Sequence, residues 1–144
     1  MRDEKLENQM TPDRKIYKDN AILLGTFFGG PLVAGYIIAE NFKSFGKSDS
    51  AKKTWLFTIL ATIIIFVVAF SIPEDVPNQL FPLIYTGIAT LVIRYYQREQ
   101  IQSHIKSGGQ VYTWGRVVVI GLIGCVITVI AVLGTVVILD LMEI

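Results

Sequence analysis

The stretch FFGGPLVAG, residues 27–35, interrupts an apolar run that otherwise has the composition of a membrane helix. Pro31 disfavours the helical region for the residue before it and cannot donate a backbone hydrogen bond to the preceding turn. Gly29 and Gly30 tolerate the positive φ values that a chain reversal needs. The stretch therefore predicts a break that divides the run into 21–29 and 32–39. Each half is about 12–13 Å long at helical rise, close to half of the roughly 30 Å hydrocarbon core of a bilayer.

Three further apolar runs, 54–72, 80–93 and 117–139, place the chain among integral membrane proteins. It has 144 residues, of which 52% are hydrophobic, so it is long enough for one small helical unit. The runs 54–72 and 117–139 are long enough to span a membrane, whereas 80–93 needs its flanking residues. The expected organisation is a cytoplasmic tail over 1–20 followed by one all-α membrane domain over 21–144. The tail carries acids as well as bases and precedes no small-residue cleavage pattern, so it is read as retained.

The 13 Lys and Arg residues predict the orientation. They all lie in the tail, in the 40–53 connection or in the 94–116 connection, and none lies in 73–78 or at the C-terminus. If the first run crossed the membrane, the tail and the 40–53 connection would lie on opposite faces, which fits the positive-inside rule poorly. If that run enters and leaves by one face, all basic residues become cytoplasmic. The expected fold is thus three transmembrane helices plus an N-terminal broken, re-entrant hairpin, with the N-terminus cytoplasmic and the C-terminus outside. Four spanning helices are the alternative.

Two helical segments are expected outside the bilayer. Thr11, Pro12 and Asp13 have the order of a capping residue, a first-turn proline and a first-turn acid, which predicts a short helix in the tail. The stretch 95–107 lacks glycine and proline and precedes two glycines, which predicts a cytoplasmic extension of the third helix to about Lys106. His104 lies on this extension and is expected to be a solvated surface residue.

The apolar runs contain no Asp, Glu, Lys, Arg or His. Ionisable residues within the bilayer usually mark proton relays, ion pathways or buried catalysis. The chain also lacks the spacing of hydrolase, metalloprotease and phosphate-binding motifs, and its formal charge of +1 argues against nucleic acid as a partner. We expect a protein that is not an enzyme and that has no catalytic residue, cofactor or metal site.

The break is one candidate site, because a broken helix offers free backbone carbonyls and N–H groups to an ion. This hinge or backbone site consists of Gly29, Gly30 and Pro31. A second set consists of small residues that allow close helix packing, within the chain, with a protein partner or in a homodimer. Its members are Gly25, Gly121, Gly124 and Cys125. A third set consists of basic residues that attract the headgroups of membrane lipids. Its members are Lys43, Lys47, Lys52 and Lys53.

The segment GGPLVAGYIIAENFKSFGKSDSAKK, residues 29–53, resembles a segment of small bacterial polytopic membrane proteins of unknown activity. The resemblance implies a bacterial inner-membrane location and brings no binding residues. The expected function is that of an accessory, scaffold or immunity-type subunit acting through helix–helix contacts. The alternative is a small transporter or channel component that uses the break at Gly29, Gly30 and Pro31.

Overall fold

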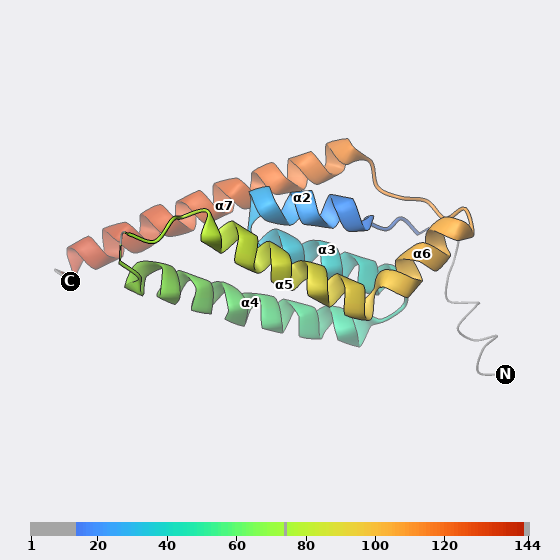
Figure 1. Ribbon diagram of the computed structural model, residues 1–144, viewed down its shortest axis with the longest axis horizontal. Helices are drawn as coiled ribbons and strands as arrows, with labels where there is room; N and C mark the ends of the chain where they lie inside the picture. Colours follow the sequence, from blue (N-terminus) through green and yellow to red (C-terminus); the bar gives the residue numbers. More distant parts are fainter. Residues whose placement is uncertain (1–13, 74, 143–144) are drawn as a thin grey trace.

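The computed structural model describes residues 14–73 and 75–142, which form six helices (Figure 1). Their bounds are α2 Asp19–Gly29, α3 Pro31–Ser44, α4 Ser48–Ser71, α5 Leu80–Tyr96, α6 Arg98–Lys106 and α7 Trp114–Leu141. Extended structure in the described residues consists of one isolated bridge between Ile16 and Val111. The expected all-α class is therefore confirmed.

The first apolar run folds as two antiparallel helices, α2 and α3, which reverse at Gly30 (Figure 1). The segment before α2 consequently lies beside the end of α3. The backbone N–H of Tyr17 donates to Asn41 Oδ1 at 2.8 Å, and Ser44 Oγ donates to the carbonyl of Lys15 at 2.9 Å. The chain thus returns to the end of the molecule from which α2 started.

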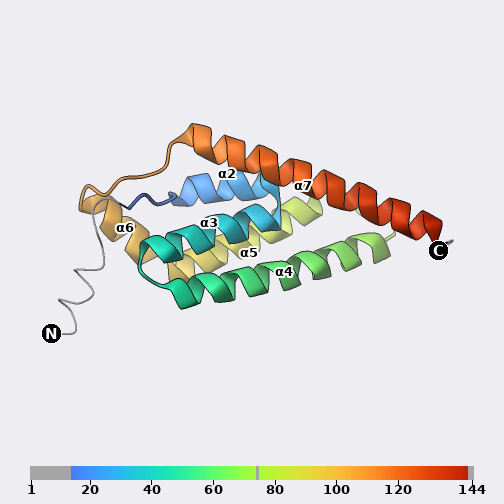
Figure 2. The same cartoon turned by 180° about the vertical axis from the view of Figure 1, so that it is seen from behind.

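This α2–α3 hairpin is the centre of the molecule. Helix α2 packs against α7 and α5, while α3 packs against α4 and, to a lesser extent, α5. Figure 2 shows α7 and α4 on opposite sides of the hairpin. The buried apolar cluster is accordingly built around hairpin residues, including Ile22, Val33, Ile37 and Phe42. The long helices are held together mainly through the hairpin.

Two helices, α4 and α7, are long and apolar enough to cross a membrane. At helical rise their 24 and 28 residues extend about 36 and 42 Å, against a hydrocarbon core of about 30 Å. In the most apolar 18-residue stretch of each helix, 0% of the residues of α4 and 17% of those of α7 are buried within the molecule. The core helix of a soluble protein would be mostly buried, so the exposed apolar surface favours a membrane location. Helix α5 is apolar but has only 17 residues.

The segment before α2 differs from the expected short tail helix. Residues 14–18 are not helical, and α2 begins only at Asp19. The backbone N–H of Ile16 donates to Gln110 O at 3.2 Å, and that of Tyr112 donates to Ile16 O at 2.9 Å. These bonds to the connection before α7 replace the bonds of a helix. The predicted start at Thr11, Pro12 and Asp13 lies outside the described residues.

The helix after the third apolar run is not continuous. Helix α5 ends at Tyr96, Gln97 leaves the helical conformation with φ −124°, and α6 resumes at Arg98. The end at Lys106 agrees with the expected extension, and Gly108 follows with φ 77°. The interruption was not expected, because the sequence has neither glycine nor proline there.

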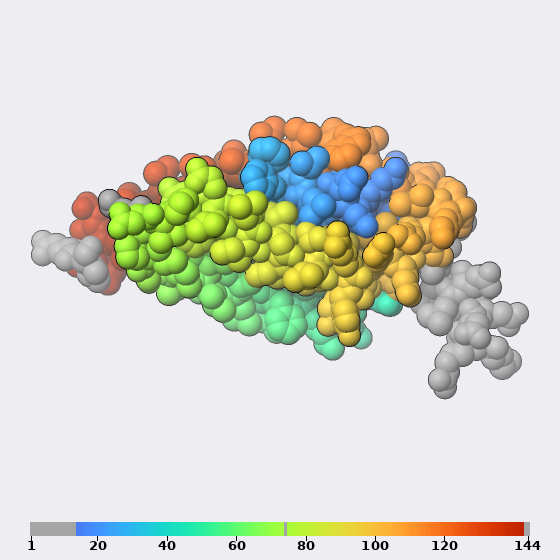
Figure 3. All heavy atoms as spheres, in the orientation of Figure 1, coloured from blue at the N-terminus to red at the C-terminus, as the bar shows by residue number. Residues whose placement is uncertain are grey.

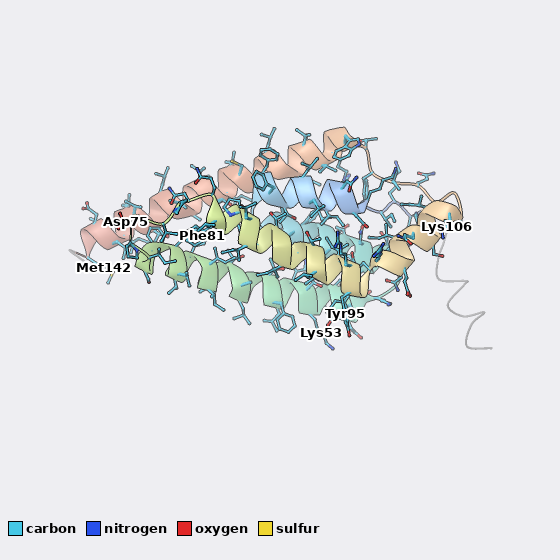
Figure 4. All side chains as sticks on the ribbon, in the orientation of Figure 1. Lys53, Asp75, Phe81, Tyr95, Lys106 and Met142 are labelled. Carbon is cyan, nitrogen blue, oxygen red and sulfur yellow. The ribbon has the colours of Figure 1, made fainter. Side chains whose placement is uncertain are left out.

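The described Lys and Arg residues all lie at one end of the long axis, whereas acids occur at both ends: Asp19, Glu40, Asp49 and Glu99 at the basic-residue end, and Asp75 and Asp140 alone among the described charged residues at the other. The starts of α2, α4 and α7, the ends of α3 and α5, and α6 lie at one end. The described residues between α4 and α5 and the end of α7 lie at the other (Figure 1). Figure 4 shows Lys53 and Lys106 toward the first end and Asp75 and Met142 at the second. We call them the basic end and the acidic end. The described Lys and Arg residues at the basic end are Arg14, Lys15, Lys18, Lys43, Lys47, Lys52, Lys53, Arg94, Arg98, Lys106 and Arg116.

Candidate functional site

The break in the first apolar run is a single-residue turn at Gly30, with φ 80° and ψ −176°. Its N–H donates to Thr26 O at 2.9 Å, which closes α2, and its carbonyl accepts from Val33 and Ala34 at 3.1 and 3.3 Å, which starts α3. Pro31 occupies the first turn of α3, where its missing N–H costs no hydrogen bond. The backbone polar groups of Gly30 therefore form hydrogen bonds with the two helices that flank the turn.

Other backbone groups near the break are covered by neighbouring helices. The hydroxyl of Tyr85 donates to Phe27 O at 3.3 Å. The carbonyl of Gly29 faces Gly124 so closely that a Cβ added at Gly124 would lie 2.6 Å from that oxygen. Pro31 lines the apolar groove described below, and neither Gly29 nor Gly30 is among the lining residues of that groove. The break accordingly serves chain reversal and helix packing more directly than it serves an open coordination site.

Small residues form the crossing of α2 and α7. A Cβ added at Gly29 would lie 3.1 Å from the Cα of Gly121, and one added at Gly25 would lie 3.4 Å from Val117 Cγ1. Gly124 completes the crossing, as described above. Cys125 does not belong to it, because its side chain is exposed on α7. Within the described chain the packing set is therefore Gly25, Gly121 and Gly124, and packing of Cys125 against a partner or a second copy stays a prediction.

A buried polar cluster lies at the basic end, where the tail, α3 and the α5–α6 junction meet. Asn41 Nδ2 donates to Tyr17 O at 3.0 Å and lies 3.4 Å from Gln97 Oε1, while Gln97 Nε2 donates to Ile38 O at 2.9 Å. Both amide side chains are fully buried. The sequence pattern did not predict this cluster. Its only signal was an amide residue within a few positions after each of two apolar runs, Asn41 after 21–39 and Gln97 after 80–93.

Tyr17 links this cluster to α7. Its side chain is fully buried, and Arg116 Nε donates to its hydroxyl at 2.9 Å. The guanidinium also lies 4.3 Å from the centre of the Tyr112 ring, a cation–π geometry. Burial raises the pKa of Tyr17 to about 12, and the hydrogen bond from Arg116 opposes part of that rise. The phenol therefore stays neutral at physiological pH.

His104 is a buried structural residue, which contradicts the expected solvated position. It is 5% exposed, and its Nε2 lies 3.0 Å from the carbonyl of Gln110. The imidazole also packs against the backbone of Gly109, where a Cβ would collide with the ring. The glycine permits the turn after α6 to fold over the ring, and this tertiary contact was not visible in the polar sequence pattern.

The four lysines of the 40–53 region are all exposed, and they differ in their surroundings. Lys43 pairs with Glu40 at 2.7 Å, and this carboxylate raises the pKa of the lysine. Lys47 and Lys52 are exposed. Lys53 borders a cavity, whereas the other three do not. All four candidate headgroup contacts are therefore surface residues, and Lys53 also borders the cavity.

That cavity is an apolar groove of about 490 Å³ between α3, α4 and α5. We call it the lateral groove. Its lining residues are Pro31, Ala34, Gly35, Ile38 and Phe42 from α3, Ser50, Lys53, Thr54, Phe57, Thr58, Ala61 and Ile65 from α4, and Tyr85, Ile88, Ala89, Val92 and Tyr96 from α5. Gly35 packs directly against Thr58, which brings α3 and α4 together along one wall. Figure 3 shows α5 and α4 side by side on one face of the molecule.

Within the described residues, no group of three or more His, Cys, Asp or Glu side chains is placed to hold a metal ion. Comparisons of the chain with protein-family models, with curated proteins and with solved structures gave no significant match. The resemblance of residues 29–53 to small bacterial membrane proteins stays a prediction. The lateral groove and the exposed faces of the long helices are the candidate binding surfaces of the described chain.

Proposed function

We propose that this chain is a non-enzymatic membrane protein of the bacterial inner membrane that acts as an accessory or scaffold subunit for another membrane protein. In this proposal α4, α5 and α7 cross the bilayer and the α2–α3 hairpin is re-entrant. Support comes from the depth of the hairpin tip. A Cβ at Gly30 would lie 3.3 Å from Thr128 Oγ1, and Thr128 lies midway along Trp114–Leu141. If α7 spans the membrane, the tip is near the bilayer centre.

The basic and acidic ends support an orientation. The positive-inside rule assigns the basic end to the cytoplasm, and the acidic end then faces outward. The polar cluster around Asn41 and Tyr17 would lie at the cytoplasmic interface, and the apolar hairpin within the hydrocarbon. Non-helical backbone at that depth needs cover from protein, and Tyr85 and Gly124 provide such cover at the turn.

The observation that carries the accessory role is the exposure of the halves of α4 and α7 beyond the hairpin tip. In residues 129–141 of α7, Thr135 and Leu139 are partly buried and every other side chain is exposed. In residues 61–71 of α4, Thr62, Ile65 and Phe66 are partly buried and every other side chain is exposed. These outer halves receive little packing from the described part of the chain, so they are suitable surfaces for the helices of a partner.

The transporter alternative has less support from the geometry. It needs backbone groups at Gly29 and Gly30 to face a permeating ion, whereas Gly29 O is covered by Gly124 and Gly30 bonds to both flanking helices. Purified protein in liposomes is therefore expected to give no flux of common monovalent or divalent ions. Flux that Gly30→Ala abolishes in a folded variant would favour transport instead.

Site-specific photocrosslinking in native membranes tests the accessory role. A photoreactive residue at Leu133, in the outer half of α7, is expected to give one discrete protein adduct. The same residue at Val118, exposed in the inner half of α7, is the matched position and is expected to give a weaker adduct. Only lipid adducts at Leu133 in membranes from the native host would contradict the proposal.

A further inference from the structure

We propose that the lateral groove binds one acyl chain of an anionic phospholipid from the basic-side leaflet, with the lipid phosphate near Lys53. The inference rests on the membrane insertion proposed above, but it does not depend on the identity of a protein partner. It follows from the size of the groove, from the distribution of polarity along it and from the position of its one charged residue.

The volume of the groove suits a small molecule or a single lipid chain. Its 490 Å³ fall within the roughly 300–1,000 Å³ of small-molecule pockets. The α3 wall from Pro31 to Phe42 is about 17 Å long at helical rise. An extended acyl chain is narrow enough to lie along a pocket of this size.

The length of the groove matches one leaflet. Along α4, the lining residues run from Ser50 at the basic end to Ile65 near the hairpin tip, a rise of about 22 Å, of which the part from Lys53 onward is about 18 Å. Half of the hydrocarbon core is about 15 Å thick. The other deep boundary is Pro31, at the reversal of the hairpin. A chain that enters at Lys53 would therefore end near the bilayer centre.

Polar groups gather at the mouth of the groove. Ser50, Lys53 and Thr54 line it on α4, and Tyr96 lines it at the end of α5. Deeper positions are mostly aliphatic or aromatic, as at Ala61 and Ile88. Among the described lining residues Lys53 alone is charged, and Figure 4 shows it toward the basic end of the molecule. An ammonium with adjacent hydroxyls complements a phosphate, and the apolar remainder complements its acyl chain.

Native mass spectrometry tests this assignment. The full chain is inserted into nanodiscs of mixed phosphatidylglycerol and phosphatidylethanolamine and then released with mild activation. We expect one retained phosphatidylglycerol on the wild-type protein. Ala61→Trp fills the middle of the groove and is expected to lower retention at least tenfold. Lys53→Gln is expected to lower the preference for phosphatidylglycerol about fivefold while retaining some lipid, since one interfacial lysine is removed.

Two matched variants separate the groove from general effects. Ala131→Trp adds the same ring to an exposed position of α7, and Lys106→Gln removes a basic residue from the same end but outside the groove. Both are expected to retain lipid like the wild type. Equal losses in Ala61→Trp and Ala131→Trp, with all variants folded by circular dichroism, would overturn the assignment.

Photocrosslinking from Ile88 checks the class of occupant, because this residue lines the groove from α5. A lipid adduct supports the proposal, and a discrete protein adduct would replace the lipid with a partner helix. Membrane insertion itself is checked by carbonate extraction of native membranes. Release of the protein would reject the membrane proposal, whereas an inserted protein without retained lipid would reject only this inference.

Discussion

Gly30 has a backbone conformation, φ 80° with ψ −176°, that residues other than glycine scarcely populate. Gly30→Ala is expected to lower the free energy of unfolding by about 1–3 kcal/mol, because the new Cβ imposes strain and approaches Thr128 Oγ1. Denaturant unfolding in detergent measures this. Gly87→Ala is the control, since a Cβ there meets nothing within 4 Å. Equal stability of the two variants would show that the turn tolerates an L-residue side chain.

Asn41 holds the tail segment by bonding both backbone groups of Tyr17. Asn41→Ala leaves the N–H and carbonyl of Tyr17 unpaired, at a cost of about 1–3 kcal/mol per buried group. We expect the tail to detach and trypsin to cleave after Lys15 and Lys18 several-fold faster than in the wild type. Asn78→Ala, at an exposed position, is expected to leave the cleavage rate unchanged. Unaltered cleavage in Asn41→Ala would mean that other contacts hold the tail.

Tyr17 is expected to make the stability of the folded protein depend on pH in the alkaline range. Its pKa is raised from 10.0 to about 12 in the folded protein, so between these values the unfolded chain loses the proton first. Stability from this group is full below pH 10 and declines up to pH 12, by about 2–3 kcal/mol in total. Unfolding midpoints of the wild type and Tyr17→Phe across this range test the effect. The wild type is expected to lose more stability than the variant, and parallel curves would contradict the assignment to Tyr17.

At the scale of helices, the crossing of α2 and α7 depends on backbone contact. A Cβ at Gly124 would lie 2.6 Å from Gly29 O and 3.2 Å from Gly29 Cα, and neither atom belongs to a flexible side chain. Gly124→Ala should therefore separate the helices and cost about 1–3 kcal/mol. Gly134→Ala, on the same helix with nothing within 4 Å, provides the control. Denaturant unfolding in detergent that gave equal midpoints for the two variants would indicate that the helices do not cross closely at Gly124.

The helices also show which features a sequence can predict. The break before Pro31 was predictable because it follows from covalent geometry, which acts whatever the surroundings are. The interruption at Gln97 has no local cause. Its amide bonds to Ile38, 59 residues away, so only the tertiary fold shows it. The buried position of His104 and the lateral groove were missed for the same reason, since both are formed by segments distant in sequence.

At the scale of the whole molecule, the hairpin has the role that a central helix has in a bundle, but only over part of the length. It joins α4, α5 and α7 near the basic end and stops near the middle of α7. The outer halves of α4 and α7 then extend beyond it with little packing (Figures 1 and 2). This asymmetry explains why the buried core lies toward the basic end and why we assign a partner surface to the outer half.

Because the hairpin brings both of its ends to the basic end, the membrane topology can be tested with single cysteines in a Cys125→Ser background. A straight first span would place Lys15 and Lys47 on opposite faces of the membrane, whereas the hairpin brings both to the basic end, where Ser44 Oγ bonds Lys15 O at 2.9 Å. We expect cysteines at Lys15 and Lys47 to react with an impermeant maleimide only after the cells are permeabilised. Cysteines at Asp75 and Met142 should react in intact cells, since Figure 4 shows both residues at the acidic end. Labelling of Lys15 and Lys47 from opposite sides would require the hairpin to open into a spanning helix, which the positive φ at Gly30 and its packing against α7 oppose.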